Sequence, residues 1–131
     1  MALAQAGERE AAARARQDEL ELALENAAAA PDLPTAARQL GDAIQRFPDR
    51  WEPRAAMARL AASAGQISAA IQGIELALEI APEEPSMLAD LAGWQLDAAT
   101  DASATIAKLR AVAPDHPALP ELDQRASATR P

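Results

Sequence analysis

Three prolines at nearly even intervals limit what this chain can fold into. Pro48 and Pro82 are 34 residues apart, and Pro114 follows 32 residues after Pro82. Steps of three and four residues place side chains on one face of an α-helix, and a helix rarely continues through a proline. Three apolar residues precede each proline; they are separated by steps of four and then three, and the last of them lies five positions before the proline. The three sets are Ala36, Leu40 and Ala43, then Ala70, Ile74 and Ala77, then Ala102, Ile106 and Leu109. This apolar ladder predicts three similar helices, each of which ends just before its proline.

The composition favours helices in the rest of the chain as well. Half of the 131 residues are hydrophobic, but only 2% are aromatic, and alanine makes up more than a quarter of the chain. Alanine has the highest intrinsic helix propensity, whereas the β-branched and aromatic residues that favour strands are scarce. The length suits one domain with a real core. We therefore expect an all-α protein with thin, closely spaced helices.

Glycine and the hydroxyl residues that often cap helices predict where the individual helices begin and end. Gly65 is expected to end a helix over residues 52–64, because glycine readily adopts the left-handed conformation found after helix C-termini. Thr35, Ser68 and Ser86 are the expected N-caps, since their hydroxyls can accept hydrogen bonds from the first turn. The remaining predictions are a long helix, or two in tandem, over residues 4–29, a helix over residues 102–112, and a short last helix containing Leu119, Leu122 and Ala126.

The apolar ladder resembles the second half of the tetratricopeptide repeat (TPR), a helical hairpin with a period of about 34 residues. We identify about three degenerate copies, residues 17–50, 51–84 and 85–116, and the third is two residues shorter between Gln95 and Ala102. The first halves match less closely. Their characteristic TPR positions are occupied by Leu20, Ala23, Leu24 and Ala27, by Arg54, Met57, Ala58 and Ala61, and by Leu88, Leu91, Ala92 and Gln95.

The resemblance implies an α-solenoid of antiparallel helical hairpins, stacked in the right-handed superhelix typical of TPR arrays. A single hairpin cannot bury its apolar face, so about three copies are needed for stability. Residues 1–16 would form an N-terminal helical extension of this array. Residues 117–131 would form a C-terminal capping helix with a frayed tail.

Charge and hydropathy exclude several classes of partner. The net charge of -8 disfavours binding to nucleic acid or anionic lipid, which require a basic surface. No apolar run approaches the length of about 18 residues that crossing a bilayer requires, so we expect no membrane insertion. The chain has no cysteine and therefore no disulfide or thiolate site. We expect a cytoplasmic location, or a periplasmic one if a signal peptide has been removed.

Residues suited to catalysis or cofactor binding are few. His116 is the single histidine and lies between Asp115 and Pro117, where a turn is expected. The paired acidic residues are neighbours at helix ends or on solvated faces, without the spacing of a metal cluster. A glycine-rich phosphate loop does not occur. We therefore expect no enzymatic activity, no metal and no cofactor, and we interpret His116 as a surface turn residue.

The TPR resemblance also implies a binding surface. TPR arrays bind an extended peptide or a helix in a concave groove lined by the first helix of each repeat. Small residues in that groove leave room for a bulky apolar side chain or a whole helix. Trp94 is a candidate hot spot if it is exposed, whereas packing is the alternative for it and for Trp51. The residues that the resemblance assigns to the groove are Glu21, Glu25, Ala55, Arg59, Ala89 and Gly93.

A run of arginines stands out in this acidic chain. Arg38, Arg46, Arg50 and Arg54, with Arg59 nearby, form a candidate basic patch. Guanidinium groups suit carboxylates, so an acidic segment of a partner is the expected ligand. The alternative is that these charges only form a solvated face.

Taken together, the residues and the resemblance predict a non-enzymatic scaffold or adaptor that binds another protein, as a peptide or a helix. One alternative is a homo-oligomerisation module in which residues 4–29 pair with their copies. The other is a regulatory arm of a larger enzyme or assembly whose other domain is outside this chain.

Overall fold

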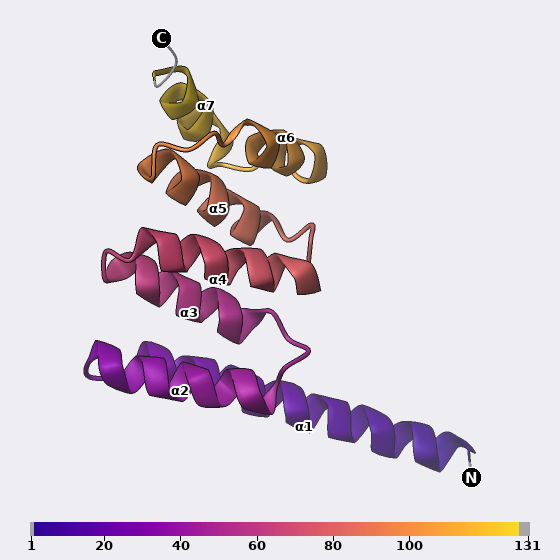
Figure 1. The fold of residues 1–131 in the computed structure, drawn as a ribbon. Helices are drawn as coiled ribbons and strands as arrows, with labels where there is room; N and C mark the ends of the chain where they lie inside the picture. The colour runs from indigo at the N-terminus through magenta and orange to yellow at the C-terminus, as the bar shows by residue number, and fades with distance from the viewer. Residues whose placement is uncertain (1, 129–131) are drawn as a thin grey trace. The chain divides into compact units, whose positions relative to one another are not determined.

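The computed structural model describes residues 2–128, and the side chains from residue 5 onward. Within this range all regular structure is α-helical, which confirms the all-α prediction (Figure 1). The helices are α1 (Ala2–Ala28), α2 (Leu33–Arg46), α3 (Glu52–Ser63), α4 (Ile67–Ile80), α5 (Pro85–Asp97), α6 (Ser103–Val112) and α7 (Leu119–Ala128). The predicted frayed tail falls largely on residues 129–131, which lie outside the described range. Two compact units make up the chain, Met1–Pro48 and Asp49–Pro131.

The first unit is a hairpin of α1 and α2. The sequence predicted either one long helix or two in tandem over residues 4–29, and the structure has a single helix there, α1. Its C-terminal half packs on α2 through Leu20 and Ala27. The end of α2 reaches back to Arg16, whose Nη2 donates to the Arg46 carbonyl at 3.3 Å. The N-terminal part of α1 therefore extends beyond α2 (Figure 1), and every side chain from residue 5 to 16 is exposed.

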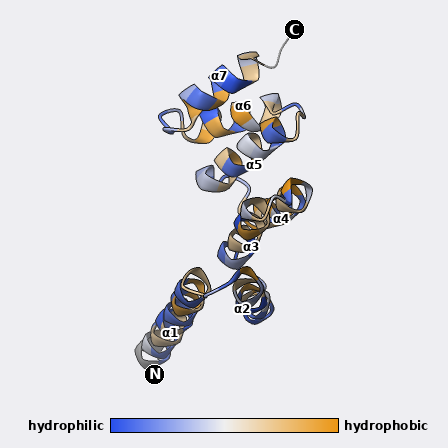
Figure 2. Cartoon of the chain, turned by 90° about the vertical axis from the view of Figure 1, so that its left-hand side faces the viewer, coloured by the Kyte–Doolittle hydropathy of each residue, from blue (hydrophilic) through white to orange (hydrophobic). Residues whose placement is uncertain are grey.

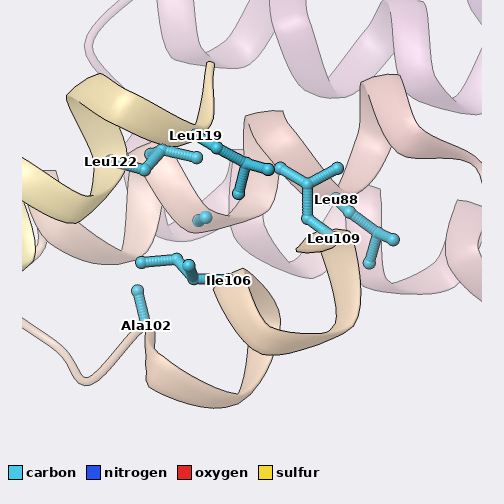
Figure 3. Packing of buried hydrophobic residues seen from close by; sticks show 7 residues of the cluster. Leu88, Ala102, Ile106, Leu109, Leu119 and Leu122 are labelled. Atoms are coloured by element: carbon cyan, nitrogen blue, oxygen red, sulfur yellow. The ribbon is translucent and has the colours of Figure 1, made fainter. Parts of the chain in front are cut away.

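The second unit contains α3 to α7 in a chain of neighbouring packings. α3 packs on α4, α4 on α5, α5 on α6, and α7 on both α5 and α6. Hydrophobic and hydrophilic residues alternate along most of these helices, as expected for helices that are apolar on one side (Figure 2). One buried cluster joins α3, α4 and α5 through Ala55, Ala58, Ile74, Ala77, Met87 and Leu91. A second joins α5, α6 and α7 through Leu88, Ala92, Ala102, Ile106, Leu109, Leu119 and Leu122 (Figure 3).

The apolar ladder faces the core in all three helices that carry it. All nine of its residues are buried; eight lie in α2, α4 and α6, and the ninth, Ala102, is the N-cap residue of α6. These helices also end alike, because the backbone N–H of Phe47, Ala81 and Ala113 each donates to the carbonyl of the residue four positions earlier. The three residues have similar backbone angles, with φ of -128°, -133° and -148°. Each precedes its proline, so the predicted helix ends are confirmed.

Two of the other helix ends also match each other. Gly65, after α3, has a φ of +81°, which confirms it as the left-handed residue that ends this helix. Ala99, after α5, takes the same role with a φ of +57°. In both turns the next residue donates its N–H back to the helix, from Gln66 to Ala61 and from Thr100 to Gln95. In each turn the left-handed residue also donates its own N–H to the helix, from Gly65 to Ala62 and from Ala99 to Leu96. The two bonds within each turn together form the Schellman motif of helix C-termini.

The three predicted N-caps are wrong. α2 is capped by Asp32, whose Oδ1 accepts from the Thr35 N–H at 2.8 Å. α4 begins at Ile67, so Ser68 lies inside the helix, and the N-cap residue Gln66 makes no side-chain cap hydrogen bond. α5 is capped by Glu84, whose Oε1 accepts from the N–H and the hydroxyl of Ser86.

The predicted third copy, residues 85–116, is shorter than the predicted second copy around the turn between its two helices. From Gly65 to the first ladder residue, Ala70, is five positions, whereas Ala99 is followed by Ala102 three positions later. α6 consequently has 10 residues where α4 has 14. α6 therefore lacks the first turn that α4 has, whereas its ladder residues keep the same spacing before the helix end as those of α4.

Candidate partner-binding surfaces

Two of the predicted groove residues lie in the first unit. Glu21 and Glu25 are both exposed on α1. The Oε1 of Glu21 accepts a hydrogen bond from Gln17 Nε2 at 3.1 Å, one turn earlier. Both carboxylates are therefore available to solvent, and the other predicted groove residues belong to the second unit.

Ala55 does not line an open surface, and its assignment to the groove is corrected. It is 0% exposed and belongs to the buried cluster of α3, α4 and α5. Ala89 is half-buried and packs against the cluster of α5, α6 and α7. The physical reason is the same for both, because an alanine allows the neighbouring helix to approach until the small side chain is itself covered.

Arg59 joins α3 to α5. Its Nε donates to Asp90 Oδ2 at 2.6 Å, and its Nη2 lies 3.4 Å from Ser86 Oγ. The Arg59 side chain remains 43% exposed, so it is accessible to a partner. A carboxylate from that partner would have to compete with Asp90.

The last two predicted residues lie further along α5. Gly93 is half-buried, and Arg125 of α7 reaches over it to bond with Asp97 at 2.5 Å. Trp94 is half-buried and packs against the cluster of α3, α4 and α5, as Trp51 does. The packing interpretation of both tryptophans is therefore confirmed. Trp94 retains part of its surface, but it is not a freely exposed hot spot.

The arginine run is divided and largely compensated. Arg38 and Arg46 lie in the first unit, whereas Arg50 and Arg54 lie in the second with Arg59. Carboxylates within the chain pair with three of these cations: Glu19 with Arg46 at 3.4 Å, Glu52 with Arg50 at 2.6 Å, and Asp90 with Arg59. Arg38 is exposed and Arg54 is half-buried. These pairs favour the interpretation of a solvated, internally neutralised set of charges over that of an open basic patch.

The sequence analysis missed the role of Phe47. This ring is buried, and the guanidinium carbons of Arg16 and Arg46 each lie 5.2 Å from its centroid. Such cation–π contacts are attractive, and the one from Arg16 joins the end of α2 to the middle of α1. The sequence does mark Phe47 as different, because the residue before the proline is alanine in the other two predicted copies, Ala81 and Ala113.

The outer face of α4 was also missed. We use this name for six exposed residues of α4: Ala69, Gln72, Glu75, Leu76, Glu79 and Ile80. Leu76 is 51% exposed and Ile80 is 38% exposed. The segment "GIELALEIAP" contains the pattern that predicts this face. Its ladder residues, Ile74 and Ala77, form one apolar face of the helix, and Leu76 and Ile80 lie on another.

The carboxyl group of Asp32 has a lowered pKa. The hydroxyl of Thr35, and then its backbone N–H, hold the pKa of Asp32 below its usual value of 3.8, because both hydrogen bonds favour the ionised form. This exposed group caps a helix, and its shift has a structural cause. It does not indicate a reactive site.

The remaining chemical candidates are structural or dispersed. His116 Nδ1 accepts from the Ala118 N–H at 3.1 Å and so shapes the turn before α7. Among the described residues, no three His, Cys, Asp or Glu side chains gather as a metal site would require. The same range contains no helix that is both long and apolar enough to span a bilayer.

Comparisons with known proteins add no assignment. The chain matches no model of a protein family, and a search of the curated proteins finds no similar sequence.

Proposed function

We propose that this chain is a TPR-like helical repeat protein that binds another protein and performs no chemistry of its own. The supporting observation is the equivalence of its copies. The ladder residues are buried at the same distances before the ends of α2, α4 and α6, and these helices end with similar backbone geometry. A repeated hairpin with one buried face and one free face is the usual basis of a binding scaffold.

Within the second unit, the proposed binding surface is the side on which α3 and α5 are joined by Arg59 and Asp90. The first helices of successive TPR hairpins line the groove of such arrays, and α3 and α5 are the first helices of copies two and three. Arg59 and Trp94 are the partly accessible large side chains of this surface. A partner segment with a carboxylate could engage Arg59, and an apolar side chain could extend the contact to Trp94.

The test is retention of a partner by the purified chain and by matched variants. Arg59→Glu reverses the charge at the proposed surface. Arg110→Glu is its control, because Arg110 also pairs with a carboxylate, Asp123, at 2.5 Å and is similarly exposed, but it lies between α6 and α7. We expect Arg59→Glu and Trp94→Ala to lose a partner that Arg110→Glu retains, with circular dichroism showing that each variant is folded. Equal retention by all variants would refute this surface.

One observation favours a second candidate function. The exposed N-terminal part of α1, residues 5–15, extends past α2 and consists mainly of alanine and charged residues. A helix without a packed face of its own gains stability when another helix covers it. Pairing between copies of α1 would make the chain a homo-oligomerisation module. Light scattering over a range of concentrations distinguishes it, because a monomer at all concentrations excludes this function.

A further inference from the structure

We propose that the outer face of α4 is a separate docking surface for a basic amphipathic segment of a partner protein. This proposal does not depend on the surface formed by α3 and α5. It rests on a side of the second unit that the repeat pattern leaves unused.

The first observation is a pair of uncovered apolar side chains. Four large hydrophobic side chains are exposed in the described part of the chain, Leu22, Leu33, Leu76 and Ile80. Two of them, Leu76 and Ile80, are four positions apart on α4 and therefore lie one turn apart on the same face. Single exposed leucines are common on protein surfaces, but two large apolar neighbours beside the exposed Ala69 form a continuous apolar edge.

The second observation is the charge next to this edge. Glu75 and Glu79 are exposed and are also one turn apart, so they form an acidic edge along the same face. α4 contains no lysine or arginine, and within the described residues neither glutamate is paired with a cation. Glu83 adds an exposed carboxylate in the turn after α4, where an open hollow is lined by Ala81, Pro82, Glu83 and Glu84.

These two edges define the chemistry of the occupant. A matching segment has two apolar side chains one helical turn apart and two cationic side chains, also one turn apart, beside them. Burial of the apolar pair would supply affinity, and the cations would supply orientation and a faster association rate. An acidic peptide, which suits Arg59, would be repelled here. The proposed partner is therefore a helix that carries leucine-like and lysine-like residues on one side.

The experiment uses a synthetic amphipathic helix of leucine, alanine and lysine, in which pairs of leucines and pairs of lysines are each four positions apart. Its binding to the full chain is measured by fluorescence anisotropy at low and at high salt. A second peptide with glutamate in place of lysine tests the charge requirement. We expect the lysine peptide to bind and the glutamate peptide not to bind. Binding should weaken as salt screens the charges.

Variants of the chain separate this face from a general attraction to an acidic protein. Leu76→Ser with Ile80→Ser is expected to weaken binding at least about tenfold, since each side chain contributes buried apolar area. Its control is Leu22→Ser, which removes an exposed leucine from α1. Glu75→Gln with Glu79→Gln is expected to weaken binding about three- to tenfold at low salt and to flatten the salt dependence. Its control is Glu8→Gln with Glu10→Gln, which removes the same charge from exposed positions of α1.

The outcomes distinguish the possible occupants. The proposal is supported if the two outer-face variants weaken binding as stated and the controls remain within about twofold of the wild type. It is overturned if the lysine peptide does not bind, or if the controls lose as much affinity as the outer-face variants. It is also overturned if the chain self-associates and Leu76→Ser with Ile80→Ser makes it monomeric, because the occupant is then a second copy. Arg59→Glu should leave binding of the lysine peptide unchanged. The test of the outer face of α4 and the test of the proposed α3–α5 surface can therefore fail independently of each other.

Discussion

Replacement of Ala99 by glycine is expected to stabilise the second unit by about 1 kcal/mol. Ala99 has a φ of +57°, a left-handed conformation that costs an L-residue about 1–2 kcal/mol. Glycine avoids this cost but gains freedom in the unfolded chain, which takes back about 0.4–1 kcal/mol. The Ala99 side chain is exposed, so its removal loses little packing. In the equivalent turn after α3 the position is already a glycine, Gly65, at +81°.

The prediction is checked by urea and thermal unfolding of two glycine variants. Ala99→Gly is expected to raise the melting temperature by roughly 4 °C, given the size of this unit. Ala98→Gly is the matched control, because Ala98 is also exposed but has a φ of -85° and no left-handed strain to relieve. It should lower the free energy of unfolding by up to about 1 kcal/mol. If the two variants shift stability in the same direction and by the same amount, the strain argument is wrong.

Three further predictions follow from burial, helix packing and capping. Leu20→Ala is expected to cost about 2–5 kcal/mol of unfolding free energy because Leu20 is buried between α1 and α2, whereas the same change at the exposed Leu22 should cost less than about 0.5 kcal/mol by urea unfolding. Gly93→Ala should raise the melting temperature more than Gly73→Ala, because alanine favours a helix more than glycine does and only position 93 has room for it. A Cβ at position 93 would lie 3.9 Å from its nearest neighbour, Nη1 of Arg125, whereas one at position 73 would lie 3.2 Å from the Cβ of Ala58. A larger rise for Gly73→Ala would contradict this prediction. The lowered pKa of Asp32 contributes stability that is fully present above its usual value of 3.8 and is lost as the pH falls through the lower pKa of the folded state. Thermal unfolding from neutral to acidic pH should therefore show a difference between wild type and Asp32→Ala that narrows below about pH 3.8, and a constant difference would count against this cap.

The proposed binding surfaces illustrate what a sequence pattern leaves open. The TPR resemblance assigned Ala55 to the groove by its position in the repeat, but its burial depends on how closely α4 and α5 approach α3. Arg59 could be identified as a cation from the sequence, yet its partner Asp90 lies 31 positions away on another helix. The outer face of α4 is an intermediate case. Its residues are visible in the sequence, but whether a neighbouring helix covers them is a property of the packing.

The sequence by itself determined the helices and the side of each second helix that faces inward. Periodicity of three and four residues, the prolines and Gly65 act within a few positions along the chain, so local rules are sufficient for them. Side-chain partners required the tertiary structure, because they are set by contacts between distant segments. The contact of Arg16 with Phe47 and the link from Arg59 to Asp90 are contacts of this kind.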